Sequence, residues 1–348
     1  MNWFNKSVRW LVFLVAVTVM LTGFTTLVMA KSTDKDVSGR VVIYTSMYED
    51  IIEAIDRTLN KRFPNIDVVF FYGGTGTLQA KVAAEIASGK LGCDMMMIAE
   101  PSYSLELKEA GILHKYLSPE RDNLAFEYDP EGYWYPVRNL NMVLAYNPEK
   151  YSLDEIPTSL YGFAYDERVK GYVSMSNPLT SGTAMAAVSA LRDKYGYEYF
   201  VALGNQNVMI ESGSVALTKL ETGECKVIMI LEESVLKKRE EEDSLLTVIY
   251  PDDGTIMIPS TIMTVSGDMS ANNNTKACEV ITDWFLSEEG QAAIVDGWMH
   301  SVLKDYGKLP YDAIPTTEIL KNAMPVNWES TYREREEIRT KFEESVKR

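Results

Sequence analysis

The sequence predicts an α/β protein with two lobes, each a mixed, mostly parallel sheet flanked by helices. Apolar strand-like runs alternate with amphipathic helical segments in the first third of the chain, and the alternation returns in its middle. Two apolar, β-leaning segments, 139–146 and 261–265, bracket the middle block, and we interpret them as hinge strands that cross between the lobes. The first lobe is then expected over 38–140 and the second over 141–259, while 260–348 returns to the first lobe and adds C-terminal helices.

The first third of the chain supplies three strands and two helices. Apolar runs at 41–44, 66–71 and 95–98 are typical of buried parallel strands. Between these runs, apolar residues recur at helical spacing over 49–62 and again over 78–86. Ligands of parallel α/β sheets bind at the carboxyl ends of the strands, so the polar residues that follow each strand are candidate contacts.

The middle block repeats this plan. Residues 171–175 and 227–231 are strand-like, whereas 181–194 and 214–220 have helical patterns. The strand over 227–231 delivers two adjacent carboxylates, Glu232-Glu233, at its carboxyl end.

Two runs of small residues, Gly-Gly-Thr-Gly-Thr at 73–77 and Ser-Gly-Thr at 181–183, each open a predicted helix. A helix N-terminus presents unpaired N–H groups and the positive end of the helix dipole, and Ser and Thr hydroxyls add donors. Each run could instead serve only as a helix cap or a tight turn. Because the runs lie in different lobes, we predict that they close on a phosphate or carboxylate.

Further candidate contacts lie near the predicted strand ends. Ser46 follows the first strand, although it could simply cap the next helix. Arg138 could neutralise a phosphate or only pair with an acidic neighbour. Of Glu232 and Glu233 we expect one in the cleft, because adjacent residues rarely face the same way. The candidate residues are Ser46, Gly74, Thr75, Gly76, Thr77, Arg138, Ser181, Gly182 and Thr183 for an anion, and Tyr48, Glu232, Glu233 and Asp253 for hydroxyls or an amine.

Residues 1–30 have the pattern of a secretory signal peptide. Lys6 and Arg9 precede an apolar stretch, and Val28-Met29-Ala30 is a plausible cleavage site. An uncleaved membrane anchor is the alternative. Without these residues the chain has 32 Lys and Arg against 50 Asp and Glu, so its formal net charge changes from −16 to −18. A body of this charge is a poor partner for nucleic acid or an anionic membrane surface.

The chain has few residues suited to covalent or metal chemistry. Cys93, Cys225 and Cys278 are too scattered for a disulfide framework or a zinc site, so we expect buried thiols, with one disulfide as the alternative. A secreted phosphoesterase needs a nucleophile with a base, or a metal cluster, and His114 and His300 lie away from the candidate residues. We expect no enzyme activity, no catalytic residue, no metal site and no cofactor.

Several short motifs follow one another in a set order. They are Val41-Val42-Ile43-Tyr44-Thr45-Ser46, Gly74-Thr75-Gly76, Leu-x-x-Lys-x-x-x-Glu from Leu78 to Glu85, Cys93-Asp94, Ala145-Tyr146-Asn147-Pro148 and Asn177-Pro178-x-x-Ser181-Gly182-Thr183. Together they resemble the extracellular solute-binding proteins of ABC importers, in the branch of ferric-ion, phosphonate and phosphorylated-sugar binders. The resemblance implies a two-lobed periplasmic-binding-protein-like (type II) fold. It also implies a periplasmic or extracellular monomer that delivers its ligand to permease and ATPase subunits.

The ligand is harder to predict than the family. Ferric-ion binders of this branch carry adjacent tyrosines where this chain has Glu232-Glu233-Ser234, and many have histidine at the place of Tyr48. In the sugar-phosphate members, Ser/Thr/Gly loops hold the phosphate and acidic groups accept hydrogen bonds from hydroxyls or an amine, a role that the carboxylates named above fit by position. We favour a phosphorylated sugar such as a hexose phosphate. Ferric iron and 2-aminoethylphosphonate are the alternatives.

Overall fold

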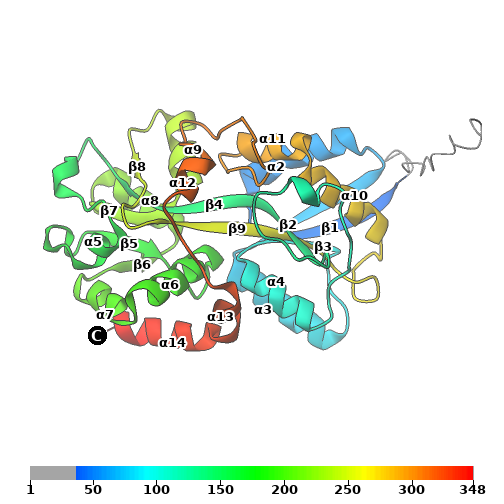
Figure 1. The fold of residues 1–348 in the computed structure, drawn as a ribbon, viewed down its shortest axis with the longest axis horizontal. Coiled ribbons are helices and arrows are strands. Elements are labelled where there is room, and N and C mark those ends of the chain that lie inside the picture. Colours follow the sequence, from blue (N-terminus) through cyan, green and yellow to red (C-terminus); the bar gives the residue numbers. More distant parts are fainter. Residues whose placement is uncertain (1–36, 348) are drawn as a thin grey trace, which may run out of the picture. The chain divides into compact units, whose positions relative to one another are not determined.

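The computed structural model describes residues 37–347 (Figure 1). The predicted signal peptide and its cleavage site lie outside the described residues. Between residues 37 and 347, no helix combines the length and the apolar character needed to cross a membrane.

The first lobe is built on three parallel strands. β1 (Gly39–Thr45) lies between β2 (Ile66–Tyr72) and β3 (Met95–Ala99) and pairs with both. The helices α2 (Glu49–Arg62) and α3 (Thr75–Ser88) connect these strands, as the sequence predicts. The carboxyl ends of all three strands therefore lie along one edge of the sheet, which is where the polar residues after each strand gather.

The second lobe repeats the arrangement. β5 (Val173–Ser176) pairs in parallel with both β6 (Met209–Glu211) and β7 (Val227–Leu231). Four helices belong to this block: α6 (Gly182–Tyr195), α7 (Glu198–Asn205), α8 (Gly213–Thr222) and α9 (Glu232–Glu242). The starts of α6, α8 and α9 follow strands β5, β6 and β7, so three helix N-termini lie at the carboxyl ends of neighbouring strands.

Two long antiparallel strands join the lobes. β4 (Trp134–Tyr146) and β9 (Thr255–Thr264) pair with each other in the middle of the sheet (Figure 1). The predicted crossing strands are thus confirmed, although both begin earlier than expected. β4 also pairs with β7 and β8 (Thr247–Ile249), and β9 with β3 and β10 (Ala323–Met324), so one hydrogen-bonded sheet runs through both lobes. All residues of β4 are buried, as expected for a strand covered on both faces.

Helices cover both faces of this sheet. The remaining ones are α4 (Pro101–Glu109), α5 (Leu160–Tyr165), α10 (Thr275–Leu286), α11 (Glu288–Asp296), α12 (Thr316–Leu320), α13 (Trp328–Arg333) and α14 (Arg335–Val346), with short 3-10 turns at Arg121–Asn123, Leu153–Glu155 and Glu167–Val169.

Cys93, Cys225 and Cys278 are buried free thiols, and burial raises the pKa of each. High pKa values keep thiols unreactive.

The C-terminal helices pack on the second lobe. α14 lies against α6 and α7 (Figure 1). The Phe342 ring lies edge-on to Phe200, with ring centroids 5.3 Å apart, and the Thr331 hydroxyl of α13 lies 2.6 Å from the Ser189 hydroxyl. Packing between distant segments determines this placement.

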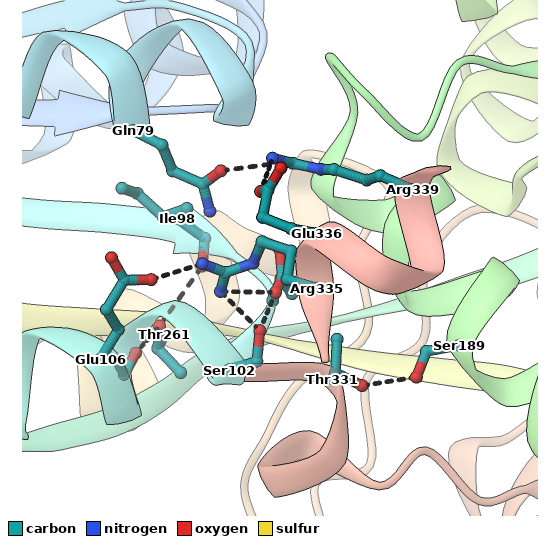
Figure 2. A network of polar contacts seen from close by, with 12 residues as sticks. Gln79, Ile98, Ser102, Glu106, Ser189, Thr261, Thr331, Arg335, Glu336 and Arg339 are labelled. Atoms are coloured by element: carbon teal, nitrogen blue, oxygen red, sulfur yellow. Dashed lines mark hydrogen bonds and ion pairs between the residues drawn. The ribbon is translucent and has the colours of Figure 1, made fainter. Parts of the chain in front are cut away.

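The same helices also contact the first lobe (Figure 2). The Arg335 guanidinium donates to Ser102 Oγ at 3.0 Å and pairs with the carboxylates of Glu106 and Glu100 on and beside α4. Arg339 donates to Gln79 Oε1 of α3 at 3.3 Å. The segment formed by α13 and α14, called here the C-terminal brace, therefore bonds to both lobes.

Candidate ligand-binding site

A pocket of about 650 Å³ is lined by residues that follow strands of both lobes. From the first lobe come Ser46 after β1, Gly74 and Thr75 at the start of α3, and Ala99 at the end of β3. From the second lobe come the starts of α6, α8 and α9. This position, outside the carboxyl ends of parallel strands, is the usual one for ligands of α/β sheets.

The two small-residue runs of the sequence meet at this pocket. The Gly76 N–H donates to the Thr180 carbonyl at 3.1 Å, and a Cβ on Gly76 would lie 2.7 Å from the Leu179 carbonyl oxygen. A Cβ on Gly182 would lie 2.7 Å from the Ala99 carbonyl oxygen. The glycines thus allow the two lobes to approach through their backbones, which any side chain would prevent.

Two predicted contacts of the first run lie outside the pocket lining. Gly76 uses its N–H for the Thr180 carbonyl, so this donor bonds to the protein and not to a ligand. Thr77 lies one position further along α3 with an exposed side chain. Only Gly74 and Thr75 of the run line the pocket.

Ser181 is both a helix cap and a pocket residue. Its Oγ accepts the Ala184 N–H at 3.2 Å and lies 3.0 Å from Thr183 Oγ1. The N–H groups of Gly182 and Thr183 belong to the first turn, where a helix provides no internal acceptor. Ser46 is placed similarly, because its Oγ accepts the Ala99 N–H at 3.1 Å and its own proton stays available.

A third helix start, which the sequence reasoning missed, lines the same pocket. Ser212 caps α8 by accepting the Val215 N–H at 3.3 Å, and its Oγ lies 3.1 Å from Ser214 Oγ. A Cβ on Gly213 would lie 3.5 Å from Ser176 Oγ. The signal was present in the sequence, since Ser-Gly-Ser at 212–214 repeats the hydroxyl–glycine–hydroxyl pattern of 181–183.

Arg138 brings a buried positive charge to the pocket. The residue is 1% exposed and lies on β4. Its Nη1 lies 2.9 Å from Met299 Sδ and 3.9 Å from Glu233 Oε1. Within residues 37–347 its Nε has no hydrogen-bond partner. Burial lowers the pKa of this guanidinium, and the Glu233 carboxylate opposes that effect.

The adjacent carboxylates Glu232 and Glu233 face different surroundings. Glu233 lines the pocket, and burial raises its pKa to about 7 despite the opposing effect of Arg138. Glu232 lies outside the pocket lining and accepts hydrogen bonds from Asn141 Nδ2 at 2.7 Å and from the Tyr250 hydroxyl, while His300 Nε2 lies 2.9 Å from its carboxylate. Only one of the pair is available to a ligand.

Asp253 is not brought to the pocket. Its carboxylate accepts the backbone N–H groups of Leu160 and Tyr161 at 2.8 Å each, at the start of α5, and the Tyr195 hydroxyl at 2.6 Å. Because helix N-termini attract carboxylates, this residue stabilises α5. The sequence placed Asp253 beside a strand end but gave no sign of the competing helix start.

Tyr48 and charged side chains complete the pocket. Tyr48 keeps 39% of its surface exposed, yet partial desolvation, followed by the Glu233 carboxylate, raises its pKa to about 12, and its hydroxyl is a donor at the pocket. At the rim, Lys237 of α9 pairs with Asp50 of α2, which links the two lobes beside the pocket. Within residues 37–347, no group of three or more His, Cys, Asp or Glu side chains is arranged to hold a metal ion.

The sequence model of the bacterial extracellular solute-binding proteins matches residues 93–329, more than half of the chain. The chain belongs to this family. An uncharacterized protein of Haemophilus influenzae is 24% identical over 277 residues, which cover 76% of this chain and 77% of the relative. As a member of this family, the protein is an extracellular solute-binding protein.

Solved structures share the two-lobed fold at low sequence identity. The periplasmic binding protein AfuA of Actinobacillus pleuropneumoniae, solved with fructose-6-phosphate bound, has a TM-score of 0.76 and 22% identity, covering 89% of this chain and 99% of its own. Iron-bound HitA of Pseudomonas aeruginosa has a TM-score of 0.74 and 21% identity, covering 88% and 99%. A periplasmic thiamin binding protein has a TM-score of 0.75 and 13% identity, covering 89% and 97%. Proteins of this fold thus bind chemically different ligands.

Proposed function

We propose that this solute-binding protein captures a phosphorylated small molecule, a sugar phosphate such as a hexose phosphate, and delivers it to a membrane permease. The observation that carries the proposal is that α3, α6 and α8 all begin at one pocket that also contains the buried cation Arg138. Helix N-termini and a buried guanidinium both favour a multiply charged oxyanion.

The non-phosphate part of the ligand would meet a different set of groups. Glu233 and Glu211 line the second-lobe side of the pocket, and Tyr48 adds a hydroxyl. A carboxyl group accepts hydrogen bonds when ionised, and Glu233, whose pKa is about 7, also donates in its protonated form, so these groups suit sugar hydroxyls, which both donate and accept. A ligand with an anionic end and a polyol end fits both parts of this lining.

Binding is expected to involve closure of the lobes about β4 and β9, the only pair of long strands that joins the two halves within residues 37–347. The contact between Gly76 and Thr180 and the ion pair between Asp50 and Lys237 join the lobes beside the pocket. Closure would exclude water from the anion, which strengthens its hydrogen bonds.

Isothermal titration calorimetry with a panel of compounds tests the proposed ligand class. The panel is glucose 6-phosphate, fructose 6-phosphate, glycerophosphate, 2-aminoethylphosphonate, inorganic phosphate, glucose and Fe³⁺. We expect at least one sugar phosphate to bind about 100-fold more tightly than inorganic phosphate or glucose, because only the sugar phosphate engages both the anion-binding groups and the carboxyl groups of the pocket.

Three results would contradict the proposal. Tight Fe³⁺ binding with a visible charge-transfer band and no response to organophosphates would favour an iron carrier. Equal affinity for inorganic phosphate and sugar phosphates would show that Glu233 does not recognise the sugar hydroxyls. Release of inorganic phosphate during the titration would favour a hydrolase.

A further inference from the structure

Met299 lies beside the buried guanidinium because the backbone next to it is hydrogen-bonded to β4. Met299 precedes His300, whose backbone pairs with Asn139 through two hydrogen bonds, Asn139 N–H to His300 O at 2.9 Å and His300 N–H to Asn139 O at 3.2 Å. Because the bridge is antiparallel, Met299 lies opposite Leu140 and diagonal to Arg138, within reach of the long Arg138 side chain, whose Nη1 is 2.9 Å from Met299 Sδ. Arg138 and Met299 are both 1% exposed.

The residues on either side of Met299 hold the same segment in place through contacts with α9. Trp298 has a φ of 62°, a left-handed conformation that is uncommon for a tryptophan, and its Nε1 donates to Glu240 of α9 at 2.6 Å. His300 Nε2 lies 2.9 Å from Glu232 of the same helix. Segment 298–300 therefore fits tightly between β4 and α9, and the Met299 thioether has a defined position.

The contacts of Arg138 are weak for a buried cation. A guanidinium has five N–H donors, and a thioether is only a weak acceptor. Glu233, the nearest carboxylate, is 3.9 Å from Nη1, which exceeds hydrogen-bond distance, and Nε has no partner within residues 37–347. Buried donors without acceptors cost free energy, so this guanidinium favours any anion that reaches it.

We propose that Met299 is a positioning residue for the ligand: its uncharged thioether holds Arg138 at the pocket without satisfying it, which leaves the guanidinium to the anionic group of the ligand. This inference rests on the proposed function, because it requires an anionic ligand. A carbonyl or carboxylate acceptor in place of the sulfur would satisfy Arg138 inside the protein. A hydrocarbon side chain at position 299 would accept no hydrogen bond, so it would not fix the position of the Arg138 guanidinium.

Two substitutions of similar volume test these alternatives. Met299→Gln introduces a strong acceptor, and Met299→Leu removes the weak one while keeping an apolar side chain. Calorimetry with glucose 6-phosphate should show affinity about 10-fold weaker for Met299→Gln and about 3-fold weaker for Met299→Leu, if the sulfur acts as proposed.

A double-mutant cycle separates positioning from packing. Each Met299 variant is also made with Arg138→Met, and millimolar ligand is used because that background binds weakly. We expect both Met299 effects to fall below about 2-fold there, because no guanidinium remains to be positioned. Equal losses in both backgrounds would show that Met299 acts only through packing and would overturn the inference.

The proposed function and this inference fail in different ways. Wild-type protein that binds none of the phosphorylated compounds overturns both. Wild-type protein that binds a sugar phosphate, with Met299→Gln and Met299→Leu both at wild-type affinity, overturns only the role of Met299. Should Met299→Gln not fold, Met299→Leu in the two backgrounds measures the same coupling without a polar group in the core.

Discussion

At the scale of single residues, Arg138 and Glu233 are a buried cation and a buried carboxyl group that line one pocket without a direct hydrogen bond between them. Their nearest charged atoms are 3.9 Å apart, and each residue is almost fully buried. Burying charges costs free energy unless they are paired and hydrogen-bonded. A ligand that bonds to both groups can therefore supply the hydrogen bonds that they lack in the protein.

The pH dependence of stability should report the buried state of Glu233. Its pKa in the folded protein is about 7, above the ordinary 4.5, so the folded state binds its proton more tightly than the unfolded state does. The contribution of Glu233 to the free energy of unfolding is then largest at low pH and falls as the pH rises from about 4.5 to about 7, by at most about 3 kcal/mol.

Urea unfolding of wild type and Glu233→Gln between pH 5 and pH 8 measures this contribution. The wild type should lose stability relative to the variant as the pH increases. A difference between the two proteins that stays constant over this range would show that Glu233 ionises normally.

At the scale of secondary-structure elements, the helix starts serve the site and the brace serves the fold. α3, α6 and α8 begin at the pocket, each with a glycine at or beside the first position, and the first N–H groups of α6 and α8 have no acceptor within their helices, whereas Gly76 of α3 donates to Thr180. Capping residues such as Ser181 have two roles, and their variants need controls that separate stability from binding.

The double variant Thr75→Ala/Ser181→Ala should lose sugar-phosphate binding and remain folded. Loss of the Ser181 cap costs about 1 kcal/mol of stability, which a domain of this size tolerates. Ser159→Ala is the matched control, because Ser159 caps α5 by accepting the Gly162 N–H at 2.9 Å and lies outside the pocket lining. Calorimetry should show full affinity for the control and no measurable binding for the double variant. If the double variant bound the ligand as tightly as the control, the helix starts would not be part of the binding site.

The C-terminal brace should contribute to stability through Arg335 in particular. Arg335→Leu leaves the buried Glu100 without its cation, and breaking a buried pair typically costs about 3–5 kcal/mol. Arg333→Leu, which removes an exposed pair with Glu109, should cost less than about 1 kcal/mol. Similar denaturation midpoints for both variants would contradict a bracing role of the buried pair.

At the scale of the whole molecule, local patterns predict the lobes but not the contacts between them. The alternating strands and helices at 41–98 and 171–231 were recognisable because apolar periodicity is a local property. The packing of α14 on α6 and α7, the placement of Asp253 at α5 and the weak contacts of Arg138 all join residues far apart in the chain. No local pattern encodes such contacts.

The candidate site was therefore only partly predictable. Residues that follow strands, such as Ser46 and Thr75, line the pocket because topology alone brings strand ends together. The orientations of Glu232 and Glu233 depend on which neighbours compete for each carboxylate. Asn141, Tyr250 and His300 bind Glu232 and leave Glu233 at the pocket.

A crystal structure of the protein with glucose 6-phosphate, or with the tightest ligand of the panel, tests the central claim most directly. We predict that the phosphate lies within hydrogen-bond distance of the first N–H groups of α6 and α8 and of Arg138, with sugar hydroxyls at Glu233. A phosphate bound elsewhere, or a metal ion in the pocket with no phosphate contact to these groups, would contradict the account.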